Sequence, residues 1–175
     1  MDSKIDQIIY DLSLLKIDDQ LQEVEEIEDD EEERELKIVL LISKFKLGPC
    51  VERLRKRVCR TDCDGFIYAY SSVKHVGMFK VGMSKHLPNR RVKMQEKKNH
   101  ETYVLKKSYF CCFHKLVEKC VHLELGEWHK PLNKVQDGYT EWFMVDWEFL
   151  DIKIKNVIKC VQELLTCDLL YLPRS

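Results

Sequence analysis

The sequence predicts an α/β domain: a small, mostly antiparallel sheet of three or four strands flanked by helices. Short runs rich in aromatic and β-branched residues, Phe66–Tyr70 and Met78–Met83, flank a small polar connector that contains Gly77. This pattern is typical of a strand pair. Longer segments, at 113–128 and 149–165, repeat their apolar residues at helical spacing. The hydrophobic content of 45% is enough for one core.

The other elements follow from the same patterns. Apolar residues at helical spacing predict an N-terminal amphipathic helix and a second helix that ends at Gly48-Pro49. Pro88 can occupy the first turn of a helix after the strand pair. We therefore expect helices over 4–17, over 36–47 and from Pro88 to 95, with further strands over 103–110 and 139–145. An apolar tail, Leu169–Leu172, ends the chain.

Charge divides the chain into two parts. Residues 1–35 contain 3 Lys/Arg and 15 Asp/Glu, whereas residues 36–175 contain 26 and 15. The acidic run Glu23–Glu35 repels itself, so it is expected to be extended or loosely helical. We divide the chain into an acidic helical extension (1–45), a basic linker (46–63), a central domain (64–147) and a C-terminal amphipathic helix packed on it (148–175).

The basic body suits a polyanion such as DNA or RNA, because cationic side chains that neutralise phosphates release counterions. The alternative is a lysine-rich surface that only keeps the protein soluble. The acidic arm is either a solvated linker or an internal mimic of phosphate that covers the body. The basic cluster Arg53–Arg57 is equally compatible with phosphate contact, nuclear import and an exposed helix face.

The sequence predicts an intracellular protein without a membrane partner. Its N-terminus is acidic and lacks a long apolar core, and no run approaches the ~20 apolar residues that span a bilayer. In a reducing compartment its eight cysteines are expected to be buried thiols. Cys50, Cys59 and Cys63 lack paired C-x-x-C spacing, so no zinc cluster is predicted.

Several polar residues are expected to lie close together. Side chains alternate along a strand, so Phe66, Tyr68 and Tyr70 share one face, and Lys80 and Gly82 share one face of the next strand. Arg90 and Arg91 follow at a helix start. His114, Glu118 and His122 are spaced four apart on the polar side of the helix over 113–128.

These motifs resemble the GIY-YIG nuclease superfamily, in its phage-ORF-type DNA-binding branch (the bacteriophage T5 type), which also occurs in fungal meiotically up-regulated proteins and large DNA viruses. Phe66-Ile67-Tyr68 and Lys80-Val81-Gly82 stand at the two signature triplets, and Arg91 stands at the helix arginine. The segments 114–125 and 139–143 resemble the histidine–glutamate helix and the closing strand. The resemblance covers roughly residues 64–147, and Lys80 replaces the second signature tyrosine.

The resemblance implies DNA binding and a metal-dependent endonuclease reaction. Its catalytic residues would be Tyr68, Lys80, Arg91 and His122, its metal ligand Glu118, and its DNA contacts Arg90, Arg91, Lys93 and Lys97. Mg²⁺ or Mn²⁺ could bind at one glutamate, since Mg²⁺ uses one or two carboxylates together with waters and substrate oxygens.

The replacement at Lys80 leaves two outcomes open. Its ammonium could lower the pKa of Tyr68 and make that phenol a base, or Lys80 could occupy the place of a tyrosine that the chemistry needs. In the second case the domain would be a catalytically inert protein-interaction module. Its partner would then bind the acidic arm and the C-terminal helix.

Overall fold

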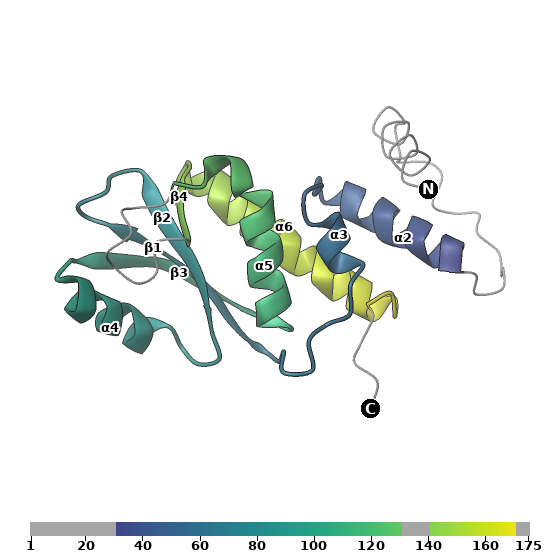
Figure 1. The fold of residues 1–175 in the computed structure, drawn as a ribbon, viewed down its shortest axis with the longest axis horizontal. Helices are drawn as coiled ribbons and strands as arrows, with labels where there is room; N and C mark the ends of the chain where they lie inside the picture. Colours follow the sequence, from purple (N-terminus) through teal and green to yellow (C-terminus); the bar gives the residue numbers. More distant parts are fainter. Residues whose placement is uncertain (1–30, 131–140, 171–175) are drawn as a thin grey trace.

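The computed structural model describes residues 31–130 and 141–170 (Figure 1). The expected helix over 4–17 lies outside these ranges, as do residues 139–140 of the expected closing strand and 171–172 of the apolar tail. Within the described ranges, no helix is long and apolar enough to cross a bilayer. All eight cysteines lie in the described part of the chain and are free.

Four antiparallel strands form one sheet in the order β3-β1-β2-β4. The strands are β1 (Gly65–Ser72), β2 (Met78–Ser84), β3 (Tyr103–Cys111) and β4 (Trp142–Met144). The central pair β1–β2 is the hairpin that the sequence predicts, and its turn contains Gly77 at a φ of 76°, which a glycine adopts without strain. The predicted α/β fold class, with its antiparallel sheet and flanking helices, is therefore confirmed.

Two helices, α5 (His114–Glu124) and α6 (Trp147–Thr166), lie on one side of the sheet, and α4 (Asn89–Asn99) lies on the other (Figure 1). The apolar stripe of α6 is fully buried in the main core, together with Ile67, Ala69 and Val81 from the sheet. A short α3 (Val51–Leu54) and a 3₁₀ turn, η2 (Gly126–Trp128), complete the described elements.

The helix α2 (Glu31–Lys44) begins five residues before the predicted start, so the end of the acidic run is helical and packed. Ile38 and Ile42 are fully buried in the main core. The Lys44 ammonium lies 2.9 Å from the Glu163 carboxylate of α6. Glu35 pairs with Arg55, which also contacts Glu52, so one arginine of the basic cluster is engaged within the fold.

The α4 side of the sheet carries a separate aromatic cluster. Val92 of α4 packs with Tyr68, Tyr70, Met78, Tyr103 and Trp142. The Tyr70 ring lies 4.8 Å from that of Tyr103 and 5.7 Å from that of Trp142, measured between ring centroids. The tyrosines of β1 are therefore held between α4 and β4.

Asp62 anchors the N-terminus of α5. Its side chain is completely buried and accepts hydrogen bonds from the backbone N–H groups of Lys115 (2.9 Å) and Leu116 (2.8 Å). A carboxylate at this end satisfies otherwise unpaired donors and complements the helix dipole. The segment before β1 thus fixes α5, which carries two of the candidate site residues.

Candidate functional site

Among the described residues, β4 pairs with Met78, Phe79 and Lys80 at the outer edge of β2. Beyond that point two side chains of α5 bind the backbone of β2. His122 donates from Nε2 to the Val81 carbonyl oxygen at 3.1 Å, and Glu118 accepts from the backbone N–H of Met83.

Tyr68 lies opposite Gly82 in the β1–β2 pairing, and its side chain covers the glycine. A Cβ atom on Gly82 would sit 2.8 Å from the Tyr68 hydroxyl oxygen and 3.0 Å from the adjacent ring carbon. Real Cβ atoms essentially never come so close to another heavy atom. Gly82 is therefore required for the position of the Tyr68 ring.

Charged groups converge on this place from three elements. The positive charge of Arg91, on α4, lowers the pKa of both Tyr68 and Glu118. The buried Lys80 ammonium lies 3.2 Å from the Glu141 carboxylate, which precedes β4. We call these groups the edge cluster: Tyr68, Lys80, Arg91, Glu118, His122 and Glu141.

The carboxyl group of Glu118 is the member most open to protonation. Its pKa is raised to about 7, mainly by burial and also by the negative charge of Glu141, whereas the Met83 N–H, Arg91 and Lys80 act in the opposite direction. At neutral pH it therefore exists as a mixture of the charged and neutral forms. A cation close to it would favour the carboxylate.

Burial shifts the pKa of both Tyr68 and His122. It raises the pKa of Tyr68 to about 12, so of the two outcomes that the Lys80 replacement left open, a lowered pKa of the phenol is not found. Lys80 lies opposite Tyr70 and bonds to Glu141 instead. Burial lowers the pKa of His122, so the ring is neutral at pH 7, and the Val81 carbonyl fixes the proton on Nε2.

The expected polar side of α5 is largely buried. His114 is only 4% exposed and donates from Nδ1 to the Cys63 carbonyl oxygen at 2.6 Å, away from the edge cluster. Glu118 and His122 are half-buried against β2. The four-residue spacing predicted that Glu118 and His122 lie on the same side of α5. That β2 covers this side could not be predicted from the helix sequence alone.

Glu141 is the member of the edge cluster that sequence reasoning missed. It stands immediately before Trp142, which pairs with Lys80 across the β2–β4 ladder. An acidic residue near a lysine on the neighbouring strand indicates an ion pair, but this can be recognised only when the strand pairing is known.

The two carboxylates suit a magnesium or manganese ion better than zinc. Glu118 and Glu141 influence each other electrostatically, and Mg²⁺ needs only one or two carboxylates besides waters and substrate oxygens. Over residues 31–130 and 141–170, no group of three or more His, Cys, Asp or Glu side chains is placed to hold a metal ion.

A basic row lies next to the edge cluster on α4. Arg90, Lys93 and Lys97 are exposed and, with Asn89 and Met94, line a surface depression of about 400 Å³. Their spacing places them on one helix face, opposite the buried Val92. Arg91 does not line the depression, and its charge acts on Tyr68 and Glu118. We call Arg90, Lys93 and Lys97 the basic row.

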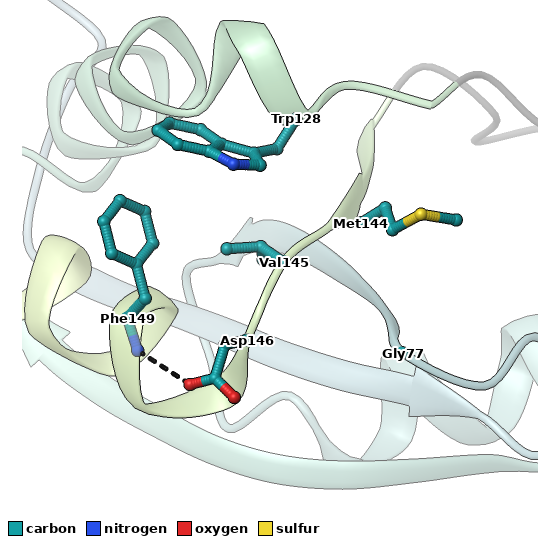
Figure 2. A pocket seen from close by; sticks show the side chains of 6 residues that line it. All are labelled: Gly77, Trp128, Met144, Val145, Asp146 and Phe149. Carbon is teal, nitrogen blue, oxygen red and sulfur yellow. Dashed lines mark hydrogen bonds between the residues drawn. The ribbon is translucent and has the colours of Figure 1, made fainter.

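A second hollow, of about 540 Å³, lies where β4 meets α6 (Figure 2). It is lined by Gly77, Trp128, Met144, Val145, Asp146 and Phe149. Figure 2 shows the Asp146 carboxylate bonded to the backbone N–H of Phe149, so this acid caps α6. None of the residues predicted for catalysis or DNA contact lines this hollow.

A four-stranded antiparallel sheet with flanking helices, a charged cluster at one strand edge and a basic helix beside it define an α/β domain of the nuclease-like type. The chain belongs to the family of the T5orf172 domain, whose model matches residues 65–165. This DNA-binding, nuclease-like domain is found in phage and fungal proteins and is linked to GIY-YIG-like folds. Searches among curated proteins and among solved structures found no match.

Proposed function

We propose that this protein binds duplex DNA through its phosphates, with the basic row and Arg91 as the contact surface. The observation that carries the proposal is the concentration of positive charge on one element. Residues 84–99 contain six Lys/Arg and a single acid, Glu96. That acid is engaged, because its carboxylate accepts a hydrogen bond from the Tyr103 backbone N–H at 2.9 Å.

The experiment compares two triple variants of equal charge. The first replaces the basic row by glutamine (Arg90→Gln, Lys93→Gln, Lys97→Gln). The control replaces Lys119, Lys155 and Lys159, which are exposed on α5 and α6. We expect the first variant to weaken duplex binding for every sequence and to reduce the slope of log K against log salt by about 2–3, since each phosphate contact contributes about 0.9. The control should change little.

Two results would contradict the binding proposal. One is wild-type binding that does not depend on salt. The other is equal loss of affinity in both triple variants, which would mean that net charge alone matters and that α4 has no special place.

We propose further that the edge cluster cleaves phosphodiester bonds. What supports this is that the charges of Arg91, Glu141 and Glu118 all act on the pKa of Tyr68, and that Arg91 and Glu141 also act on Glu118. Arg91 would clamp the phosphate through its planar guanidinium. Glu118 and Glu141 would hold Mg²⁺ or Mn²⁺, which would stabilise charge on the phosphate and on the leaving oxygen.

Tyr68 would take the proton from the attacking water. Because burial raises its pKa to about 12, the phenol keeps its proton at neutral pH, and cleavage should accelerate as the pH rises. His122 would act as a positioning residue, because it fixes the β2 backbone beside the cluster through the Val81 carbonyl. Lys80 would hold Glu141 in place.

Plasmid nicking with Mg²⁺ or Mn²⁺, measured between pH 7 and pH 9, tests the cleavage proposal. Glu118→Gln and Tyr68→Phe should each abolish nicking while duplex affinity stays within about twofold, and Lys119→Gln should nick as the wild type does. Nicking by either of the first two variants excludes its residue from the role. If the wild type is inert at pH 9 with Mn²⁺, the cleavage proposal fails while the binding proposal stands. Lys80→Tyr then tests whether the second signature tyrosine restores cleavage.

The alternative of an inert protein-interaction module would have to use another face of α6 than the apolar stripe. That stripe is buried in the core, whereas Ile152 on the same helix is exposed. The acidic arm lies mainly outside the described residues, so a protein partner for it stays a prediction.

A further inference from the structure

An aromatic pair stands on the open part of the sheet. Phe110 of β3 lies opposite Phe66 of β1, and the two ring centroids are 5.4 Å apart in an edge-to-face arrangement. Phe110 is 63% exposed, and Phe66 is half-buried. The contact restrains both rings, although a phenylalanine on an edge strand gains little stability from so much exposure to water.

The pair shares a sheet face with Tyr68 of the edge cluster. Phe66 lies two residues before Tyr68 on β1, so both side chains leave the same face, about 7 Å apart along the strand. Tyr68 packs in the aromatic cluster covered by Val92 of α4, whereas Phe66 and Phe110 lie outside that cluster. The face is therefore covered at the Tyr70 end and open at the Phe66 end.

Positive charge lies on one side of this opening. Ser84, the residue paired with Phe66 on β2, is followed by the exposed Lys85 and then by the cationic helix α4. Arg91 of that helix acts electrostatically on Tyr68, two residues from Phe66. Aromatic rings beside cationic groups are the arrangement with which proteins hold single-stranded nucleic acid, since a base stacks on the ring while its phosphates meet the cations.

We infer that Phe110, supported by Phe66, is a stacking platform for one unpaired base of the bound DNA. The inference rests on the proposed function and specifies its substrate: DNA in which an unpaired nucleotide adjoins a duplex. In an intact duplex each base is stacked between its neighbours and offers no free face. An unpaired base has a free face that can stack on an exposed ring such as Phe110.

The test uses a duplex with a short single-stranded overhang that carries one 2-aminopurine, and the same duplex without the overhang. The wild-type protein should bind the overhang probe more tightly and quench the 2-aminopurine fluorescence. Phe110→Ala should weaken binding of the overhang probe by roughly 5- to 150-fold, the range for loss of one stacked base. It should leave the blunt duplex unaffected, and Phe110→Trp should restore both affinity and quenching.

Val104→Ala is the matched control, because Val104 is an exposed apolar residue on the same strand, at 45% exposure. This change should alter the affinity for neither probe, and the melting temperatures of all variants should agree within a few degrees. Equal weakening by Val104→Ala and Phe110→Ala would overturn the platform, as would equal binding of both probes by the wild type with no effect of Phe110→Ala.

The outcomes separate this inference from the proposal on which it rests. If the wild type binds neither probe, DNA binding itself fails. If it binds both with a normal salt dependence and Phe110→Ala is silent, only the platform fails. Sedimentation of the free protein supplies a further check, since a Phe110→Ala variant that loses self-association would identify the pair as a contact between two copies, against the inference.

Discussion

At the scale of single residues, the position of Tyr68 requires a glycine at residue 82. Gly82 leaves the space that the phenol occupies, and the ring stacks almost parallel to Tyr70, with centroids 6.0 Å apart and an interplanar angle of 8°. A rigid phenol in a fixed place suits a group that must meet a water or a phosphate at a defined distance.

Gly82→Ala should therefore displace Tyr68 and destabilise the protein by about 1–3 kcal/mol, as overpacking of a dense core does. Chemical denaturation measures the loss. Gly126→Ala is the control, since a Cβ there meets nothing within 4 Å. The double variant with Tyr68→Phe should recover part of the loss because the nearest clashing atom is gone. Strict additivity of the two changes would show that the hydroxyl is not the obstacle.

Glu118 should make stability depend on pH in an unusual direction for a carboxylate. Its pKa is about 7 in the folded protein against an ordinary 4.5, so between these values the folded state binds more protons than the unfolded state. Stability from this group is complete below pH 4.5 and falls as the pH rises to 7.

Glu118→Gln removes this titration and keeps an oxygen for the Met83 N–H. The variant should therefore be more stable than the wild type above pH 7, by about 1–3 kcal/mol after allowance for solvent screening, with no advantage at pH 4. Paired denaturation curves at pH 4, 6 and 8 measure the difference. The exposed Glu127→Gln serves as the control and should show a flat difference. A flat difference for Glu118→Gln would contradict the raised pKa.

At the scale of elements, α5 takes its place from a residue outside it. Asp62 precedes β1, yet its carboxylate binds the first turn of α5, and the Cys63 carbonyl accepts from His114 in the same turn. The histidine–glutamate helix is thus joined to the strand that carries Tyr68. These hydrogen bonds, together with the sheet, therefore set the positions of the side chains in the edge cluster.

Asp62→Ala should cost about 1–3 kcal/mol, because it leaves buried backbone donors of α5 unpaired. Asp64→Ala, two residues on and exposed, is the control and should stay within about 0.5 kcal/mol. If the hydrogen bonds of Asp62 and Cys63 position α5, Asp62→Ala should also slow duplex nicking or weaken metal binding under conditions where the protein is still folded. A destabilised variant with unchanged metal affinity would limit Asp62 to a purely structural role.

The order and type of the elements could be predicted from sequence, because the periodicity of apolar residues is a local property. Strands at 66–70 and 78–83 and helices near 113–128 and 149–165 match β1, β2, α5 and α6 within a few residues. Helix ends were less predictable: α5 stops at Glu124 and continues as a 3₁₀ turn. Residues 31–35 of the acidic run are the first residues of α2, where Glu35 forms an ion pair with the largely buried Arg55. Arg55 is 20 residues away in sequence, so no local pattern reveals this pairing.

The candidate site was predictable in part. Strand alternation placed Tyr68 near Arg91, and the resemblance to the nuclease superfamily implied that Glu118 joins them; the charges of Arg91 and Glu118 both act on Tyr68. The pairing of Lys80 with Glu141 joins residues far apart in sequence, so only the folded sheet reveals it. The rise in the pKa of Tyr68 comes from burial, which depends on α4 and β4 together.

At the scale of the whole molecule, the charge of the chain is segregated. Residues 1–30 carry 11 Asp/Glu and 2 Lys/Arg, whereas the rest of the chain has 27 Lys/Arg and 19 Asp/Glu. We therefore expect the arm and the basic body to attract each other at low salt, and the arm to compete with DNA for the same surface.

Removal of residues 1–30 should tighten DNA binding, with the largest gain at low salt, since the Debye length falls to about 10 Å at 0.1 M. The truncation ends at residue 30 because Glu35 and Arg34 already contact the body, the latter through the Asp168 carbonyl oxygen at 3.0 Å. Titrations of both proteins at about 20 mM and 200 mM salt measure the effect. A charge-neutral arm, with its acids changed to Asn and Gln, should behave as the truncation does. Equal affinities at the lower salt would reject competition by the arm.

The packing of α2 against α6 has a consequence for biosynthesis. Lys44 and Glu163 are 119 positions apart, so at roughly 5–20 residues per second α2 leaves the ribosome about 6–24 s before the helix that covers it. During that interval Ile38 and Ile42 have no core to enter. We expect the dense negative charge just upstream to keep the nascent chain from associating with its neighbours, as charged residues that flank aggregation-prone segments do. The acidic run would serve solubility on the ribosome before it serves any role in the finished protein.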